Sequence, residues 1–80
     1  MPLRRTPLPE WAITRRRELG QQLGAARRRA GLSQEQLGDL VGMERRTIQR
    51  YESGARDPRY TDLLLIADAL EVPLAVLVRA

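Results

Sequence analysis

One segment, residues 31–54, restricts the fold of this chain more than any other: GLSQEQLGDLVGMERRTIQRYESG. Ser33 stands three residues before Gln36, and this spacing predicts a capping box at a helix N-terminus. Gly42 follows about two turns later, and glycine readily adopts the left-handed backbone conformation in which a helix ends and the chain turns. The segment therefore predicts two short helices joined by a tight turn, a helix-turn-helix.

Gly38 lies inside the first of these two helices. A glycine in a helix interior costs about 1 kcal/mol relative to alanine, so its presence calls for a structural reason. We expect close approach of the neighbouring helix at this position. The alternative is a surface glycine that the helix simply tolerates.

The rest of the chain also predicts helices, because apolar residues recur at three- and four-residue intervals and no run alternates as strands do. The shared faces contain Leu19, Leu23, Ala26 and Ala30 in one helix and Tyr60, Leu63, Ile66, Ala67 and Leu70 in another. We expect five helices, over about residues 15–30, 34–40 and 44–53, from Pro58 after an Asp57 cap, and after Val72.

The first thirteen residues differ in composition from the remainder. They contain Pro2, Pro7 and Pro9, which oppose regular structure until Pro9 or Thr14 begins a helix. We therefore expect a flexible basic arm over residues 1–13 and one all-α helix-turn-helix domain over residues 14–80. Trp11 is expected to cover one end of the core rather than to anchor a partner.

Composition narrows the function. Cysteine and histidine are both absent, which excludes zinc fingers, thiol nucleophiles and Ser-His triads, so no metal, cofactor or enzymatic activity is expected. No apolar run approaches the roughly 20 residues of a membrane span, and no signal peptide is visible, so a cytoplasmic protein without membrane contact is expected.

The charge is unevenly distributed. All 14 basic residues are arginine and the net charge is +4. Residues 1–32 carry eight arginines and two acids, whereas residues 33–80 carry six arginines and eight acids. This imbalance predicts a basic patch suited to a polyanion, and arginine binds phosphate or guanine through two parallel hydrogen bonds.

The second helix of the motif is expected to have two different faces. At about 100° per residue, Ile48 and Tyr51 point inward together. The opposite side carries Arg46, Gln49, Arg50 and Ser53, with Arg45 on its flank. These side chains either bind an acidic partner or simply make an exposed face soluble.

From about Leu19 to Leu77 the chain resembles the phage-repressor and Cro-type regulators of the XRE family. GLSQEQL, TIQRYESG and LLIADALEVPL occur in the usual order and spacing of that family. The resemblance implies a five-helix lambda-repressor-like DNA-binding domain, with the helix-turn-helix formed by helices 2 and 3. It also implies a transcriptional regulator, expected to be a repressor, that reads double-stranded DNA with helix 3 in the major groove.

The resemblance assigns roles to individual residues. The base-reading positions are Arg45, Arg46, Gln49 and Arg50. Ser33 and Gln34 match phosphate-binding positions of the family, although Ser33 could serve only as a cap. Phosphate contacts are also expected at Thr47 and, from their place in the turn after the third helix, at Arg56 and Arg59, for which solvated loop charges are the alternative. An ion pair between Arg27 and Glu52 is also implied. Two positions depart from the family pattern: Glu44 replaces the usual Ser or Thr cap of helix 3, and Leu65 replaces a charged residue.

Further contacts are expected outside the motif. The candidate arm contacts with DNA are Arg4, Arg5, Arg15 and Arg16. For Arg4 and Arg5, disorder without function is the alternative. Because one small domain makes few base contacts, we expect a homodimer on half-sites about 34 Å apart. Leu65, Val72 and Val76 are the candidate dimer residues.

A protein-interaction module with the same fold, an adaptor or an antitoxin-like partner of an unknown acidic protein, is the alternative function. The outward arginines of helix 3 favour DNA, because a protein-binding face more often presents apolar and aromatic anchors.

Overall fold

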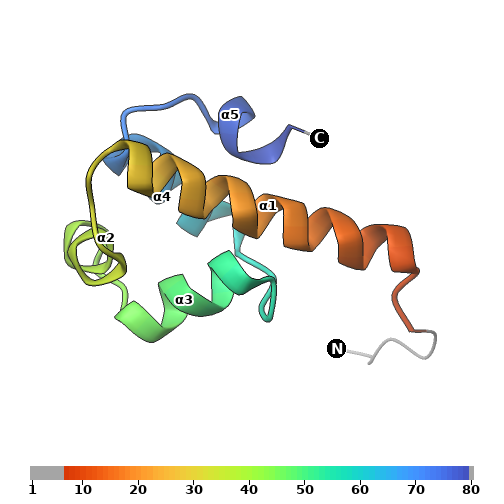
Figure 1. Ribbon diagram of the computed structural model, residues 1–80. Helices are drawn as coiled ribbons and strands as arrows, with labels where there is room; N and C mark the ends of the chain where they lie inside the picture. Colours follow the sequence, from red (N-terminus) through yellow and green to blue (C-terminus); the bar gives the residue numbers. More distant parts are fainter. Residues whose placement is uncertain (1–6, 80) are drawn as a thin grey trace.

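Five α-helices follow one another along residues 7–79, the part of the chain that this computed structural model describes (Figure 1). They are α1 (Glu10–Arg29), α2 (Gln34–Val41), α3 (Arg45–Ser53), α4 (Tyr60–Ala69) and α5 (Leu74–Val78). The predicted all-α, five-helix architecture is confirmed. None of these helices is long and apolar enough to cross a bilayer.

Helix α1 begins earlier than the predicted domain boundary. Pro9 is extended, with φ −64° and ψ 151°, and its carbonyl oxygen accepts hydrogen bonds from the N–H groups of Ala12 and Ile13. Proline is suited to this place because the first N–H groups of a helix need no intrahelical acceptor. The prediction of an arm over residues 1–13 is therefore wrong for residues 10–13, which are helical. Arg4 and Arg5 lie outside the described residues.

The turn between α2 and α3 follows its sequence signals. Ser33 Oγ accepts a hydrogen bond from the Gln36 N–H at 3.0 Å, and Gln36 Oε1 accepts one from the Ser33 N–H at 2.8 Å. Gly42 ends α2 with φ 71°. A Cβ atom on Gly38 would lie 2.5 Å from the Met43 carbonyl oxygen. A close approach at Gly38 is confirmed, but the predicted neighbour is wrong: it is the backbone of the turn that leads into α3, and not the neighbouring helix.

Helix α4 begins two residues later than expected. Arg59 is its N-cap and is extended, with φ −70° and ψ 148°, so Pro58 cannot be the first helical residue. Pro58 is instead buried in the connection between α3 and α4. The predicted cap at Asp57 is therefore wrong.

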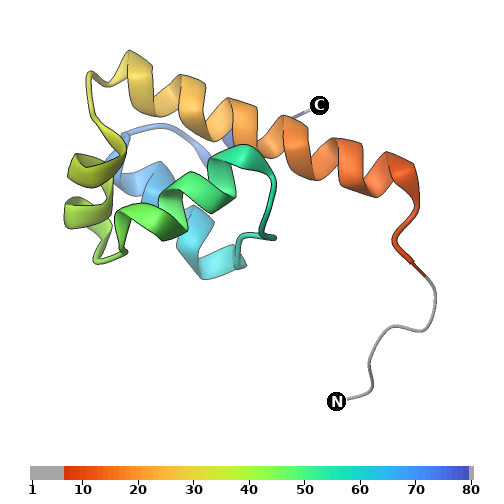
Figure 2. The ribbon, with the colours of Figure 1, turned by 60° about the horizontal axis from the view of Figure 1, so that its bottom comes forward.

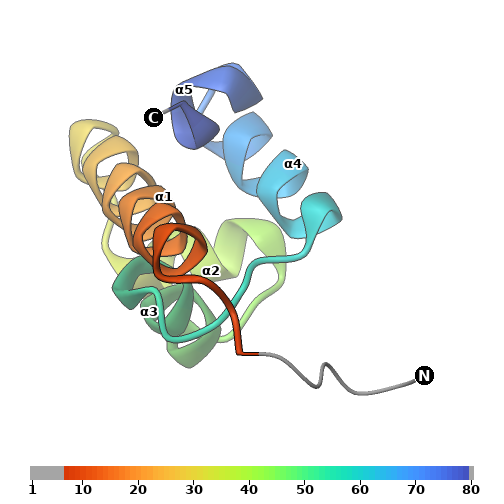
Figure 3. The same ribbon diagram turned by 90° about the vertical axis from the view of Figure 1, so that its right-hand side faces the viewer.

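The core lies between α1 and the four shorter helices. Its buried apolar residues are Leu23, Ala26, Leu37, Ile48, Tyr51, Leu63, Ile66, Ala67, Leu70 and Leu77. Helix α1 packs against α3 on one side and α5 on the other, and Figure 3 shows this arrangement in a view along α1.

Three predicted core positions are exposed. Trp11 is 71% exposed and Tyr60 is 65% exposed, because each stands in the first turn of its helix. Figures 1 and 2 show the first turns of α1 extending past the other helices. Ala30 is exposed because it is the C-cap of α1.

Candidate nucleic-acid interface

Helix α3 has the two faces that its sequence predicts. Ile48 and Tyr51 are 1% and 3% exposed and belong to the core. The opposite side presents Arg45, Arg46, Gln49, Arg50 and Ser53, all of them exposed. Three guanidinium groups and one amide therefore share a surface on which hydrogen-bond donors outnumber acceptors.

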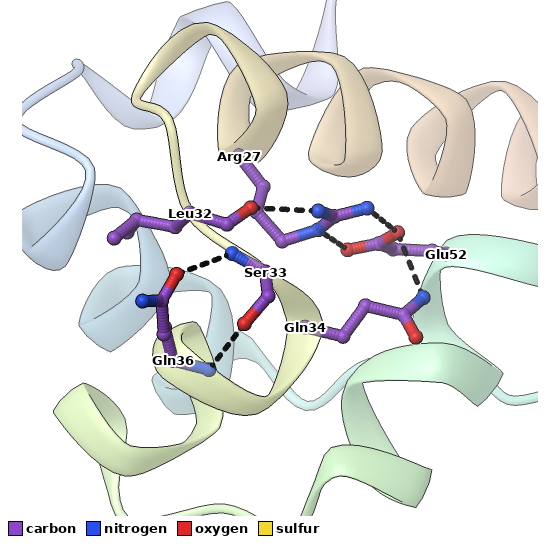
Figure 4. Close-up of polar contacts among 6 residues, drawn as sticks. All are labelled: Arg27, Leu32, Ser33, Gln34, Gln36 and Glu52. Carbon is purple, nitrogen blue, oxygen red and sulfur yellow. Dashed lines mark hydrogen bonds and ion pairs between the residues drawn. The ribbon is translucent and has the colours of Figure 1, made fainter.

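An ion pair holds the last turn of α3 against α1 (Figure 4). Arg27 donates to Glu52 twice, from Nε to Oε2 at 2.6 Å and from a terminal nitrogen to Oε1 at 2.9 Å. A third bond, 2.8 Å long, joins the Arg27 guanidinium to the Leu32 carbonyl oxygen. The hydrogen bond to Glu52 raises the pKa of Arg27, against a lowering effect of burial. The ion pair implied by the family resemblance is present.

A second buried polar contact joins α3 to α4. The Tyr51 hydroxyl donates to Asp62 Oδ2 at 2.6 Å. Burial, and then this hydrogen bond, raise the pKa of Tyr51, because both favour the neutral phenol. Arg59 Nε lies 3.6 Å from the same carboxylate oxygen, so Asp62 is also beside one of the predicted phosphate-binding arginines.

Two glycines that the sequence analysis overlooked set the distance between α1 and α3. A Cβ atom on Gly20 would lie 2.5 Å from the Tyr51 carbonyl oxygen and closer still to that of Glu52. Gly24, one turn later, faces the Glu52 side chain, with Oε1 3.1 Å from its ideal Cβ position. Their four-residue spacing on one helix face was the available signal, since glycine is unfavourable inside a helix.

Residues predicted to hold phosphate lie on both sides of α3. On the α2 side, Ser33 is exposed, and Gln34 Nε2 donates to Glu52 Oε1 at 3.2 Å (Figure 4). An amide nitrogen has two N–H donors, so this bond uses one of them. On the α4 side, Thr47, Arg56 and Arg59 line a hollow of about 460 Å³.

Two carboxylates lie beside the predicted phosphate-binding residues on the α4 side of α3. Glu44 and Asp62 line the same hollow as Thr47, Arg56 and Arg59. Glu44 is the N-cap of α3 but makes no side-chain cap hydrogen bond, as expected for this longer side chain. The α4 side therefore combines positive and negative groups, whereas the outward face of α3 carries no acidic group among its exposed donors.

The remaining predicted residues are dispersed. Arg15 lies 3.8 Å from Glu18 on the same helix, and Arg16 Nε donates to the Gly54 carbonyl oxygen at 2.9 Å. Leu65 is 50% exposed, whereas Val72 and Val76 are partly buried. Within residues 7–79, no three acidic side chains gather where they could hold a metal ion.

A helix-turn-helix domain family matches residues 18–80. The structure is similar to the restriction-modification controller protein C.AhdI from Aeromonas hydrophila, with 34% identity, a TM-score of 0.74, and 76% of this chain and 92% of that chain covered. It is also similar to the P22 c2 repressor protein, solved in complex with synthetic operator 9T, with 26% identity, a TM-score of 0.71 and the same coverage of each chain. No curated protein matches.

The family match includes the whole of α2, α3, α4 and α5. Both similar structures support the same arrangement of helices. The resemblance to phage repressors, first identified from three sequence motifs, is thereby confirmed. The chain belongs to the helix-turn-helix family and has the lambda-repressor-like fold of its XRE members.

Proposed function

We propose that this protein binds double-stranded DNA sequence-specifically, inserts α3 into the major groove and represses transcription. The observation that carries the proposal is the outward face of α3, where Arg45, Arg46, Gln49 and Arg50 are all exposed while Ile48 is buried. The similarity to a controller protein and to a repressor bound to its operator supports it.

The side chains of α3 have chemistry suited to base edges. Arg45 or Arg46 donates two hydrogen bonds to O6 and N7 of guanine, and Gln49 pairs with an adenine edge. Each such pair discriminates between bases by about 1 to 3 kcal/mol. Arg50 binds either a base or a phosphate. We therefore expect each half-site to contain guanine.

Phosphate contacts on both sides of α3 set its position in the groove. Ser33 and Gln34 stand at the N-terminus of α2, where unpaired N–H groups and the helix dipole favour an anion. On the opposite side of α3, contacts with the phosphates of the other DNA strand come from Thr47, Arg56 and Arg59. Contacts of this kind orient the protein and carry no sequence information.

The functional unit is a homodimer in the cytoplasm, with one half-site for each protomer. Leu65, Val72 and Val76 form the dimer contact, and half-sites lie about 34 Å apart. The half-exposed Leu65 supports this assignment, because a partner protomer would cover its apolar surface.

Titration of mixed-sequence duplex DNA at several salt concentrations tests the proposal. Binding should weaken with salt at a log-log slope of about −0.9 per phosphate contacted. No duplex binding at low salt would contradict DNA recognition and favour a protein-interaction module. Selection of bound duplexes from a random pool then gives the operator.

Two variants separate the proposed roles. Arg46→Ala should relax base preference at one position of the selected sequence, because a base contact is lost. Arg59→Ala should weaken binding to all sequences similarly and reduce the salt slope by about 0.9. If both variants weakened binding to the selected operator and to mixed-sequence DNA by the same factor, the assignment of Arg46 to a base and Arg59 to a phosphate would be contradicted.

A further inference from the structure

The first two turns of α1 lie outside the helix-turn-helix family region. The family match begins at residue 18, whereas α1 is one continuous helix that begins at Glu10. We call residues 10–17 the α1 extension. It contains three consecutive arginines, residues 15–17. They are the sixth to eighth residues of α1, beyond the first turn in which the helix dipole opposes positive charge.

The α1 extension is attached to the end of α3. Arg16 Nε donates to the carbonyl oxygen of Gly54, the residue that ends α3 with φ 77°. The stem of Arg17 lies against the same glycine, since Arg17 Cγ is 3.0 Å from the position of an ideal Cβ on Gly54. The chain after Gly54 stays close to α3, because the backbone N–H of Arg56 donates to the Arg50 carbonyl oxygen at 3.3 Å. Arg17 is therefore close to the C-terminal end of the proposed reading face.

The three arginines do not share one side of the helix. Arg17 and Thr14 line a hollow of about 300 Å³ together with Glu10 and Ile13. Arg15 is rotated by about 160° from Arg17 at 100° per residue and lies near Glu18 instead. Figure 3 shows residues 7–9 running from the start of α1 toward the side of the molecule on which α3 lies.

We propose that Arg17, with the hydroxyl of Thr14, binds a DNA phosphate beyond the base pairs that α3 reads. Arg16 is a positioning residue, which fixes the α1 extension to Gly54. The Arg17 guanidinium supplies the charge and two parallel donors, and the threonine hydroxyl supplies a further donor. Glu10 borders the same hollow, so its carboxylate weakens the site. This inference rests on the proposed DNA binding. The contact would lengthen the segment of DNA that the protein covers.

The test uses the full chain and a duplex that contains the selected operator with ten further base pairs on each side. Arg17→Met keeps the apolar stem that packs on Gly54 and removes the charge. We expect roughly fivefold to tenfold weaker binding near 0.1 M salt and a salt slope smaller by about 0.9, as for one lost phosphate contact. Arg79→Met is the matched control, because it makes the same charge change at the end of α5, on the other side of α1 from α3, and it should leave the slope unchanged.

Two further measurements locate the contact. Glu10→Gln should strengthen binding by roughly threefold, because a carboxylate near the phosphate is neutralised. Shortening the duplex to the operator alone should abolish the difference between the wild-type chain and Arg17→Met, because the outer phosphate is then missing.

The possible failures are distinguishable. Equal weakening by Arg79→Met and Arg17→Met, or an effect of Arg17→Met that persists on the short duplex, would overturn the site while leaving DNA binding by α3 intact. Absence of duplex binding by the wild-type chain would overturn both proposals. Thermal unfolding of each variant by circular dichroism checks that the fold is retained.

Discussion

The two helices of the helix-turn-helix begin in different ways. Helix α2 begins at Ser33, whose hydroxyl and backbone N–H both form hydrogen bonds with Gln36. Helix α3 begins at Glu44, which makes no side-chain cap hydrogen bond. A good cap contributes about 1 kcal/mol to a helix, so α2 has a local source of stability at its start that α3 lacks.

Helix α3 compensates through contacts with distant parts of the chain. Its last turn is joined to α1 by Arg27 and Glu52, and to α4 by Tyr51 and Asp62. Gly20 allows the α1 backbone to approach the end of α3 closely, as the first of these contacts requires. The comparison teaches that the helix proposed to read DNA owes its position to tertiary packing, whereas its neighbour α2 owes its start to adjacent residues.

Removal of Arg27 should have the largest effect on this arrangement. Arg27→Met leaves the Glu52 carboxylate buried without its charged partner, and we expect the free energy of unfolding to fall by about 3 to 5 kcal/mol. Urea denaturation measures the loss. The double variant Arg27→Met with Glu52→Leu should recover much of the stability, because neither buried charge remains. Failure of the second substitution to restore stability would show that the pair does more than neutralise charge.

Gly20→Ala tests the close approach of α1 and α3. Alanine normally stabilises a helix by about 1 kcal/mol relative to glycine. Here the added methyl group meets two backbone carbonyl oxygens, so we expect a net loss of about 1 to 3 kcal/mol. Gly24→Ala is the matched control, with a smaller loss, because its nearest neighbours are the movable ends of the Arg28 and Glu52 side chains. A stabilised Gly20→Ala variant would contradict the tight contact.

Tyr51→Phe removes the buried hydrogen bond between α3 and α4. We expect a loss of about 1 to 3 kcal/mol at neutral pH, because the Asp62 carboxylate loses a buried donor. The raised pKa of Tyr51 in the folded state also predicts a pH dependence. Its stabilising effect is fully present below the unfolded-state pKa of about 10 and is lost as pH rises through the higher folded-state pKa. Chemical denaturation at pH 7 and above pH 10 should show a smaller alkaline loss for Tyr51→Phe than for the wild-type chain.

The smallest expected effects concern the helix caps themselves. Ser33→Ala should lower stability by about 1 kcal/mol, whereas Glu44→Ala should change it by less than about 0.5 kcal/mol. Thermal unfolding of the two variants under one set of conditions compares them directly. Glu44→Ser should stabilise the fold, because serine caps a helix better than glutamate. Equal losses at Ser33 and Glu44 would mean that the two helices begin in similar ways after all.

Several features could be predicted because they depend on neighbouring residues. The capping box at Ser33, the turn at Gly42 and the outward arginines of α3 all follow from spacing within a single helix or turn. The incorrect predictions concern helix ends and their surroundings. Trp11 and Tyr60 match an apolar periodicity, but whether another helix covers the first turn of α1 or α4 depends on where that helix lies.

The sequence by itself determined the five helices, the sharp turn at Gly42 and which side of α3 is charged, because caps, glycine conformations and helical periodicity act over a few residues. Only the tertiary structure decided how α3 is oriented. The contacts of Gly20 with the end of α3, and of Gln34 with Glu52, join residues 18 or more positions apart. Such contacts depend on distances between helices, which no local pattern specifies.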